Sequence, residues 1–345
     1  VLLAAPLGLG SPPEGRTWKC DDKKVVGEVP VCIVNSSHFS EDDLVLSFKG
    51  NIDISLGTFK SRWGRILIEA TGAVQIGQAA TLSAHDGVSI TASGIESSAH
   101  SAINANRGDI VANSTRRSST KLCATDLEAR TITLIGADIT VTQGTTLQAS
   151  DSISMLGPST DDGIPTGCSK GFVIDGASGK PVFLNAPVLR LACGDGTVHV
   201  TGNATIGMLN YPGRLGSLDI QAASVLVAPV VTISGGDIRV RASGSVQFNA
   251  STVAITEHGF APSGWNDDVV DGNAFGALRI TTPQDLILGS HTSFWNFDRV
   301  IVAAGSISVM SMRTTTVGAD SCKNNQSSKQ DCCSFLLGKF GDGTA

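Results

Sequence analysis

Residues 66–112 read ILIEATGAVQIGQAATLSAHDGVSITASGIESSAHSAINANRGDIVA, and within them two apolar residues flanking one middle residue recur every 22 positions. The same spacing continues on both sides of this stretch. The first residues of successive pairs are 22, 22, 22, 22 and 21 positions apart. A fixed repeat of this length indicates a solenoid. The pairs are Leu44 and Leu46, Ile66 and Ile68, Val88 and Ile90, Ile110 and Ala112, Ile132 and Leu134, and Ile153 and Met155.

Each repeat contains further short runs in which apolar residues alternate with polar ones, such as Val74 and Ile76 before Leu82. Alternation at a spacing of two predicts strands rather than helices. Corners fall at Gly, Asn and Asp, as in residues 84–87, where a positive φ costs little. We therefore predict an all-β fold, a single-stranded parallel β-helix with three short strands per turn of about 22 residues. Parallel crossovers favour right-handed coiling. A β-sandwich is the structural alternative, but its strands need not recur at a fixed interval.

The regular spacing also suggests boundaries. Residues 1–43 are expected to form an N-terminal cap and residues 44–317 the β-helix, because an uncapped solenoid exposes a sheet edge. Polar segments at 157–171 and 256–276 are predicted to be loop insertions. Residues 318–345 are expected to form a cysteine-containing C-terminal cap or the start of a further module. Between 157 and 217 the pattern does not decide which strand continues the first strand of each repeat.

Eight cysteines and five N-x-S/T sequons suggest the cellular compartment. None of the cysteines forms a C-x-x-C pair, so a metal cluster is a poor fit and disulfides are expected. We predict a bridge between Cys20 and Cys32, while the other pairings stay open; Cys168 and Cys193 are expected to pin the polar loop. Sequons together with disulfides favour a secreted or cell-surface glycoprotein. The cysteines are Cys20, Cys32, Cys123, Cys168, Cys193, Cys322, Cys332 and Cys333, and the sequons are Asn35, Asn113, Asn203, Asn249 and Asn325.

Several classes of function lack their sequence signals. A net charge of −6 gives no basic footprint, so nucleic acid is not an expected partner. No apolar run is long enough to predict a membrane span. The six histidines are dispersed, and we find no H-E-x-x-H, no G-x-S-x-G and no P-loop. We expect no metal and no cofactor.

The insertion at 256–276 holds the candidate binding residues. An exposed Trp beside carboxylates suits carbohydrate binding, because the ring stacks on a sugar face while the acids accept hydroxyl protons. The same acids suit glycoside hydrolysis only at a set separation, which the spacing in a loop does not establish. The structural alternative is a loop that packs its aromatic side chains on the rod. The candidates are His258, Trp265, Asp267, Asp268 and Asp271.

Coils such as Gly87–Gly94, Gly108–Ala112 and Gly236–Ala242 resemble the degenerate G-x-I-x-I-x-A repeats of filamentous-haemagglutinin-type adhesins. This resemblance, at the level of architecture, implies a secreted right-handed β-helix that serves adhesion or surface structure. The cysteines and sequons depart from those nearly cysteine-free bacterial proteins and fit a eukaryotic surface or fibre protein better. Pectin-lyase-like enzymes share the general fold and cluster acids with Arg or Lys on one sheet face. Here the sequence shows only scattered outward residues, the acids Glu69 and Asp219 and the arginines Arg239 and Arg279.

The sequence thus predicts a secreted, glycosylated structural or adhesive β-helix, a subunit of an extracellular fibre, sheath or cell-surface appendage. The expected partners are further copies of the chain and extracellular glycans. A polysaccharide lyase or hydrolase, and a carbohydrate-binding module without catalysis, are the two alternatives.

Overall fold

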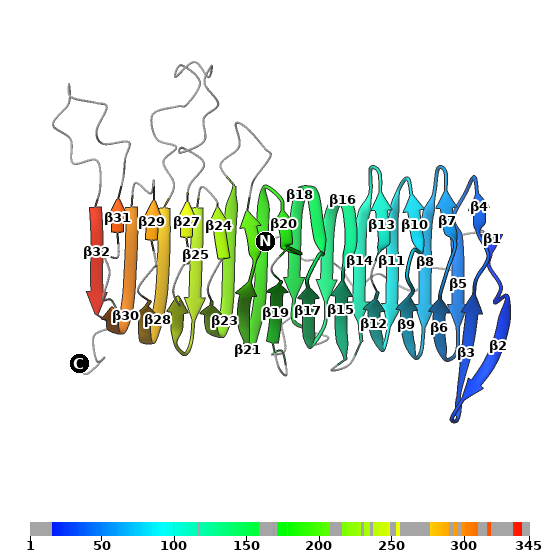
Figure 1. The fold of residues 1–345 in the computed structure, drawn as a ribbon, viewed down its shortest axis with the longest axis horizontal. Helices are drawn as coiled ribbons and strands as arrows, with labels where there is room; N and C mark the ends of the chain where they lie inside the picture. Colours follow the sequence, from blue (N-terminus) through cyan, green and yellow to red (C-terminus); the bar gives the residue numbers. More distant parts are fainter. Residues whose placement is uncertain are drawn as a thin grey trace, which may run out of the picture.

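The computed structural model describes residues 16–98, 100–115, 118–158, 168, 171–177, 179–207, 216–228, 231–234, 237–248, 253–255, 277–289, 293–295, 299–309, 316–318 and 334–339. These residues form strands, turns and bends, without a helix. The strands stack in sequence order along one long axis, from β1 to β32 (Figure 1). The described residues contain no helix that is long and apolar enough to cross a membrane.

Apart from one antiparallel pair at the start, the strand pairings separate into three parallel ladders, which are the three walls of the solenoid. Six long strands bend at a corner and so contribute to two ladders each. Ladder A contains β1 (Arg16–Thr17), β5 (Leu44–Phe48), β8 (Arg65–Ala70), β11 (Gly87–Ala92), β14 (Asp109–Ser114), β16 (Thr125–Ile135), β18 (Thr146–Leu156), β21 (Val188–Gly202), β23 (Ser217–Val227), β25 (Asp237–Ala242), β28 (Ala277–Leu288), β30 (Arg299–Val309) and β32 (Ser334–Lys339).

Ladder B begins with the only antiparallel strand pair named in the described residues, β2 with β3. It contains β2 (Asp22–Val26), β3 (Val29–Val34), β6 (Asn51–Ile54), β9 (Ala73–Ile76), β12 (Gly94–Ser97), β15 (Ser119–Cys123), β17 (Asp138–Thr142), β19 (Gly171–Gly176), the ends of β21 and β23, β26 (Val246–Phe248), and the ends of β28 and β30.

Ladder C completes each turn. It contains β4 (His38–Ser40), β7 (Thr58–Ser61), β10 (Thr81–Ala84), β13 (Ser101–Ala105), the starts of β16 and β18, β20 (Val182–Asn185), β22 (Ala204–Gly207), β24 (Val231–Ser234), β27 (Val253–Ile255), β29 (Ser293–Trp295) and β31 (Thr316–Gly318).

The register of ladder A confirms the repeat read from the sequence. Leu44 pairs with Ile66, Ile66 with Val88, and Val88 with Ile110. Ile110 then pairs with Ile132, and Ile132 with Ile153. The parallel β-helix with about 22 residues per turn is therefore confirmed, while its right-handedness stays a prediction.

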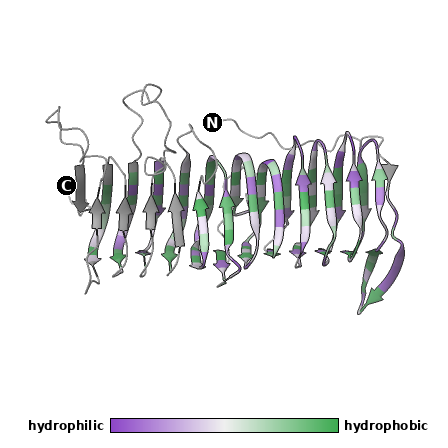
Figure 2. Cartoon of the chain, turned by 45° about the horizontal axis from the view of Figure 1, so that its top comes forward, coloured by the Kyte–Doolittle hydropathy of each residue, from purple (hydrophilic) through white to green (hydrophobic). Residues whose placement is uncertain are grey.

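The core is a column of small apolar side chains inside the three ladders. Ile66, Ile68 and Ile90 are fully buried, and the middle residue of each pair faces outward. Figure 2 shows the resulting alternation of hydrophobic and hydrophilic residues along the strands. Burying one Ile, Leu or Val side chain stabilises the fold by roughly 1.5–3 kcal/mol, so the stack gains its stability from many separate contributions.

One glycine shows why corners restrict residue choice. Gly87 begins β11 with a φ of +146°, a conformation that side-chain-bearing residues rarely adopt. A Cβ atom there would lie 2.8 Å from the carbonyl oxygen of Asp109 on the next coil. Tight stacking of coils at this corner therefore requires glycine.

The structure settles the register that the sequence left open after residue 157. Leu189 of β21 pairs with Ile153, so β21 continues ladder A. Phe172 continues ladder B, and Leu184 continues ladder C. Residues 157–170 are therefore inserted at the corner between ladders A and B.

A disulfide between Cys168 and Cys193, here named the corner disulfide, joins the end of that insertion to the next coil, with 5.3 Å between the two Cα atoms. This agrees with the expectation that these two cysteines pin the polar loop. Gly196 leaves the space for it, because a Cβ at that position would lie 2.6 Å from Cys193 Sγ. The corner disulfide therefore fixes two successive coils to each other where the repeat is interrupted.

Residues beyond the predicted boundary at 317 continue the solenoid. Strand β32 pairs in parallel with β30, and Phe335 takes the ladder position of Val300. Residues 334–339 thus add one more rung to ladder A.

Candidate functional site

The N-terminal end of the core is covered by Trp18. Its backbone N–H donates a hydrogen bond to the carbonyl of Val45, 2.8 Å away, which places Trp18 one rung beyond Leu46. Its ring is 5% exposed and lies 4.3 Å from the ring of Phe59 and 4.8 Å from that of His38, between centroids. Trp18 therefore closes the end of the apolar column.

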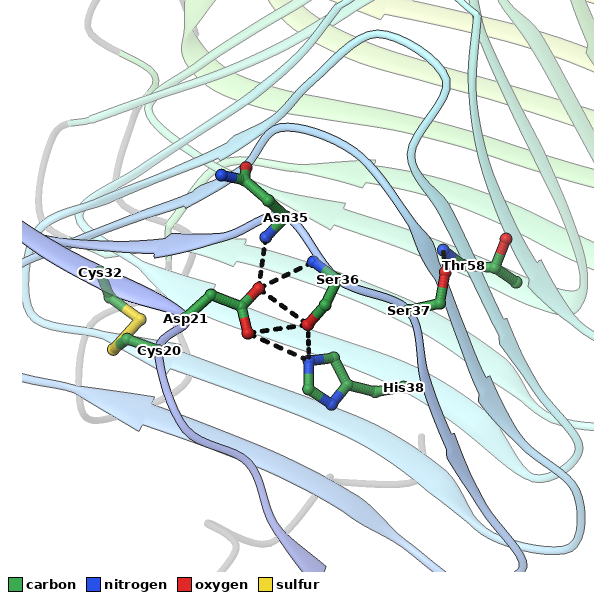
Figure 3. Close-up of polar contacts among 8 residues, drawn as sticks. All are labelled: Cys20, Asp21, Cys32, Asn35, Ser36, Ser37, His38 and Thr58. Carbon is green, nitrogen blue, oxygen red and sulfur yellow. Dashed lines mark hydrogen bonds and ion pairs between the residues drawn. A yellow bond between two sulfur atoms is a disulfide. The ribbon is translucent and has the colours of Figure 1, made fainter.

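Asp21 fastens the chain beside this plug, as Figure 3 shows. Its carboxylate accepts hydrogen bonds from the backbone N–H groups of Asn35 (2.6 Å) and Ser36 (2.7 Å) and from the Ser36 hydroxyl (2.7 Å). The predicted bridge between Cys20 and Cys32, here named the end disulfide, is present one residue away, with 5.2 Å between Cα atoms. Together these contacts hold the segment after Trp18 against the turn that follows β3.

Ser36, His38 and Asp21 include the residue types of a hydrolytic triad, but not its geometry. In a triad the carboxylate binds one ring nitrogen of the histidine and the serine hydroxyl faces the other. Here His38 Nε2 lies 2.9 Å from Ser36 Oγ and 3.9 Å from Asp21 Oδ1, so both groups face the same nitrogen. The Ser36 hydroxyl donates a hydrogen bond to the carboxylate of Asp21. This cluster stabilises the chain end and does not activate a nucleophile.

The protonation states agree with a stabilising role. Partial burial would raise the pKa of Asp21, but hydrogen bonds from Ser36 and Asn35, with His38 nearby, outweigh it and leave that pKa below its ordinary value. Burial lowers the pKa of His38, and the charge of Asp21 offsets this only in part. At neutral pH the cluster therefore holds an ionised Asp21 beside a neutral His38.

Strand β2 forms the outer edge of ladder B at this end. All five of its residues are exposed, and among the described strands it pairs only with β3. Lys23 and Lys24 lie in its middle. Charged side chains on an edge strand oppose pairing with a further strand, so this end of ladder B is protected against strand addition.

The outer face of ladder A carries a second group of polar side chains, near the other end of the rod. Arg190 pairs across the ladder with Asp219, Asp219 with Arg239, and Arg239 with Arg279. These four side chains occupy the outward middle position of four successive rungs, which are about 4.8 Å apart. Arg241 lies beside them on the same face of β25.

Two ion pairs cross this face. Arg241 Nη2 donates to both carboxylate oxygens of Asp219, at 2.7 and 3.0 Å. Arg239 donates through Nε and Nη2 to one oxygen of Asp237, at 3.1 and 2.7 Å. Arg190 and Arg279 are exposed and have no ion pair with another residue in the described part of the chain. We name Arg190, Arg239, Arg241 and Arg279 the arginine strip.

From the sequence, the outward acids and arginines were expected to be scattered rather than aligned on one face, and this expectation was wrong. The strip was missed because the residues of its column, Arg190, Asp219, Arg239 and Arg279, are 29, 20 and 40 residues apart, so no fixed spacing reveals them. Only the strand register across the irregular segments between Arg190 and Arg279 aligns them. The Asp21 cluster was missed for a related reason, since it lies in an irregular segment without a repeat.

The predicted carbohydrate-binding residues of the 256–276 insertion lie outside the described residues, namely His258, Trp265, Asp267, Asp268 and Asp271. No group of three or more His, Cys, Asp or Glu residues placed to hold a metal occurs in the part of the chain that is described.

The sequons and remaining cysteines differ in their settings. Asn35 is exposed at the turn after β3, while Asn113 and Asn203 are half-buried. Cys123 is a free cysteine, contrary to expectation, and the residue paired with it across ladder B is Thr142. The other predicted positions lie outside the described residues, namely Asn249, Asn325, Cys322, Cys332 and Cys333.

Comparison with known proteins found no matching family model, no matching curated protein and no matching solved structure.

Proposed function

We propose that the chain is a secreted, glycosylated rod with a structural and adhesive role, a subunit of an extracellular fibre, sheath or cell-surface appendage. The observation that carries the proposal is the unbroken register of ladder A from β1 to β32. A stack in which every coil contacts only its neighbours forms an elongated rod with long flat sides, instead of a closed globular surface.

Outward charged groups support the same role. Arg130 bonds to Asp109 (3.1 Å) and Arg62 to Glu41 (3.4 Å), each partner being 21 residues away along the chain. These pairs join one coil to the next on the outside of the rod. They tie the stack together at the surface, as the apolar column does inside.

The closed N-terminal end determines how such rods would assemble. Because Trp18 covers the core and the lysines of β2 discourage strand pairing, we expect contacts along the sides of the rod. Sedimentation velocity over a hundredfold range of concentration, together with negative-stain electron microscopy, tests this. Assembly in which β2 becomes protected from hydrogen exchange would contradict it, and so would a monomer at every concentration that adheres to no surface.

Secretion and glycosylation are tested separately. Intact mass before and after deglycosylation and reduction should show N-glycans and disulfides on the native protein. Asn35 is the first site to examine, because its exposed side chain at a turn gives a glycan room. Asn35→Gln should therefore remove one glycan mass, and an unmodified native chain would count against an extracellular location.

A polysaccharide lyase or hydrolase is the second candidate, favoured by the two aspartates that lie among the arginines of ladder A. Asp219→Asn and Asp237→Asn would abolish release of fragments from polygalacturonate if these carboxylates act in catalysis. Asp109→Asn is the matched control, because Asp109 also pairs with an arginine on the outside of ladder A. Equal activity in all three variants would exclude this candidate site.

A further inference from the structure

The arginine strip carries more positive charge than the fold neutralises. Four arginines share the face with two aspartates, Asp219 and Asp237, which leaves a local excess of two positive charges on a chain whose net charge is −6. Arg239 and Arg279 are direct partners across the ladder. Like charges that face each other on adjacent strands destabilise a sheet. Folding alone gives no reason for this arrangement.

The side chains around the strip leave its guanidinium groups accessible. Arg239 and Arg241 are 51% and 53% exposed. Apart from Asp237, the other outward neighbours on the same rungs are small or uncharged, as with Ser217, Gln221 and Thr281. Val188, two residues before Arg190 on the same face, is 46% exposed and offers an apolar contact beside the charges.

We propose that the arginine strip is a binding site for a linear acidic polysaccharide, whose carboxylate or sulfate groups are bound by the arginines. Each guanidinium has five N–H donors in a planar fork that matches such anions. The ion pairs above use at most two of these donors on Arg239. The three arginines of the middle column lie on rungs roughly 4.8 and 9.6 Å apart, so one extended chain along the rod meets all of them. The inference rests on the adhesive part of the proposed function and gives it a ligand.

A repeating polyanion fits the strip better than a nucleic acid does. Single-stranded nucleic acid is bound by basic grooves that also carry aromatic side chains on which the bases stack. The strip and its described neighbours on ladder A contain no aromatic residue between Arg190 and Arg279. A nucleic acid therefore serves as a competing outcome of the test.

The test measures binding of the full chain to four probes by isothermal titration at low and at physiological salt. Polygalacturonate supplies carboxylates, dextran sulfate supplies sulfates, dextran is the neutral polymer, and a single-stranded oligonucleotide is the other polyanion. We expect binding to one or both acidic polysaccharides, weaker binding at higher salt because the charges are exposed, and no binding to dextran. The two acidic arms distinguish a carboxylate ligand from a sulfate ligand.

The variant is Arg239→Ser with Arg279→Ser, and the control is Arg62→Ser with Arg130→Ser, which removes two exposed arginines elsewhere on the rod. The first should weaken binding by at least about tenfold, since each lost charge-assisted contact is worth about that factor, while the control should retain the native affinity. Far-ultraviolet circular dichroism of both variants checks the fold.

Three results would overturn the proposal: equal loss in the variant and the control, equal affinity for the oligonucleotide, or no binding to either acidic polymer. Sedimentation of the same variant separates this inference from the proposed function. Loss of polysaccharide binding with unchanged self-association removes only the ligand, whereas absence of both assembly and adhesion removes the structural role as well.

Discussion

Replacing the plug at the end of the core should open the rod from that end. Trp18→Ala removes a 5% exposed indole that packs against Phe59 and His38. Truncating a buried aromatic residue costs about 3–5 kcal/mol. The indole Nε1–H is buried and has no hydrogen-bond partner among the described residues, however, and losing an unsatisfied donor returns about 1 kcal/mol. We therefore expect a loss of about 3 kcal/mol, confined to the first coils.

The matched control is Trp63→Ala. Trp63 is 57% exposed and packs only at the surface, against Arg62 at 5.2 Å and His85 at 5.6 Å. Losing a cation–π contact at an exposed site costs roughly 0.5–1 kcal/mol, so this variant should be nearly as stable as the native chain.

Hydrogen exchange followed by mass spectrometry is the appropriate assay, because a long repeat array need not unfold in a single transition. In Trp18→Ala, amides of β5 and β6 should exchange about a hundredfold faster, which corresponds to about 3 kcal/mol, while β17 should be unchanged. Trp63→Ala should leave both regions close to native. Equal acceleration along the whole rod, or none in β5 and β6, would refute the view of Trp18 as a local plug.

Three further predictions concern the corners and the chain end. Gly108→Ala should destabilise the chain strongly, since a Cβ there would overlap the backbone carbonyl of Asp86. Gly94→Ala should destabilise it only slightly, because the nearest contact of a Cβ there is at 3.5 Å. The urea midpoints of the two variants test this difference. Serine at both positions of the corner disulfide, which spans 25 residues, should cost about 3 kcal/mol in the same assay, and an unchanged midpoint would mean that the bridge constrains nothing. Acid should weaken the N-terminal end: with the pKa of His38 held below its ordinary 6.5, the unfolded chain binds more protons just below that pH, so stability falls as pH decreases. His38→Gln should remove this loss in exchange measurements on β5, and an identical loss in that variant would assign it to other groups.

The regular coils were predictable because their contacts repeat at a constant chain separation. Each pair from Leu44 to Ile153 lies in register with the next, and the apolar spacing already showed this. After residue 157 an insertion removes the constant separation. The strands at Phe172, Val182 and Leu189 then have similar alternating patterns, so local sequence does not distinguish their ladders. The register there follows from the stacking of whole coils on one another.

The candidate site depended on that register and was less predictable. Arg239 and Arg279 were expected to face outward, and both are exposed. Their alignment with Arg190 through Asp219 depends on the lengths of the irregular segments between these residues and on the ladder to which each flanking strand belongs. Long-range alignment of this kind has no short motif, and so it becomes visible only when the coils are stacked.

Because the register between β5 and β18 is constant, the length of the rod can change in whole units of one coil. Removing or copying one unit of 22 residues inside this region would bring an equivalent corner onto an equivalent corner, and an Ile or Val above another. Such an event would change the reach by one rung, about 4.8 Å, and leave both extremities as they are. A gene encoding this fold can therefore adjust the length of its product by simple duplication, without redesigning any contact.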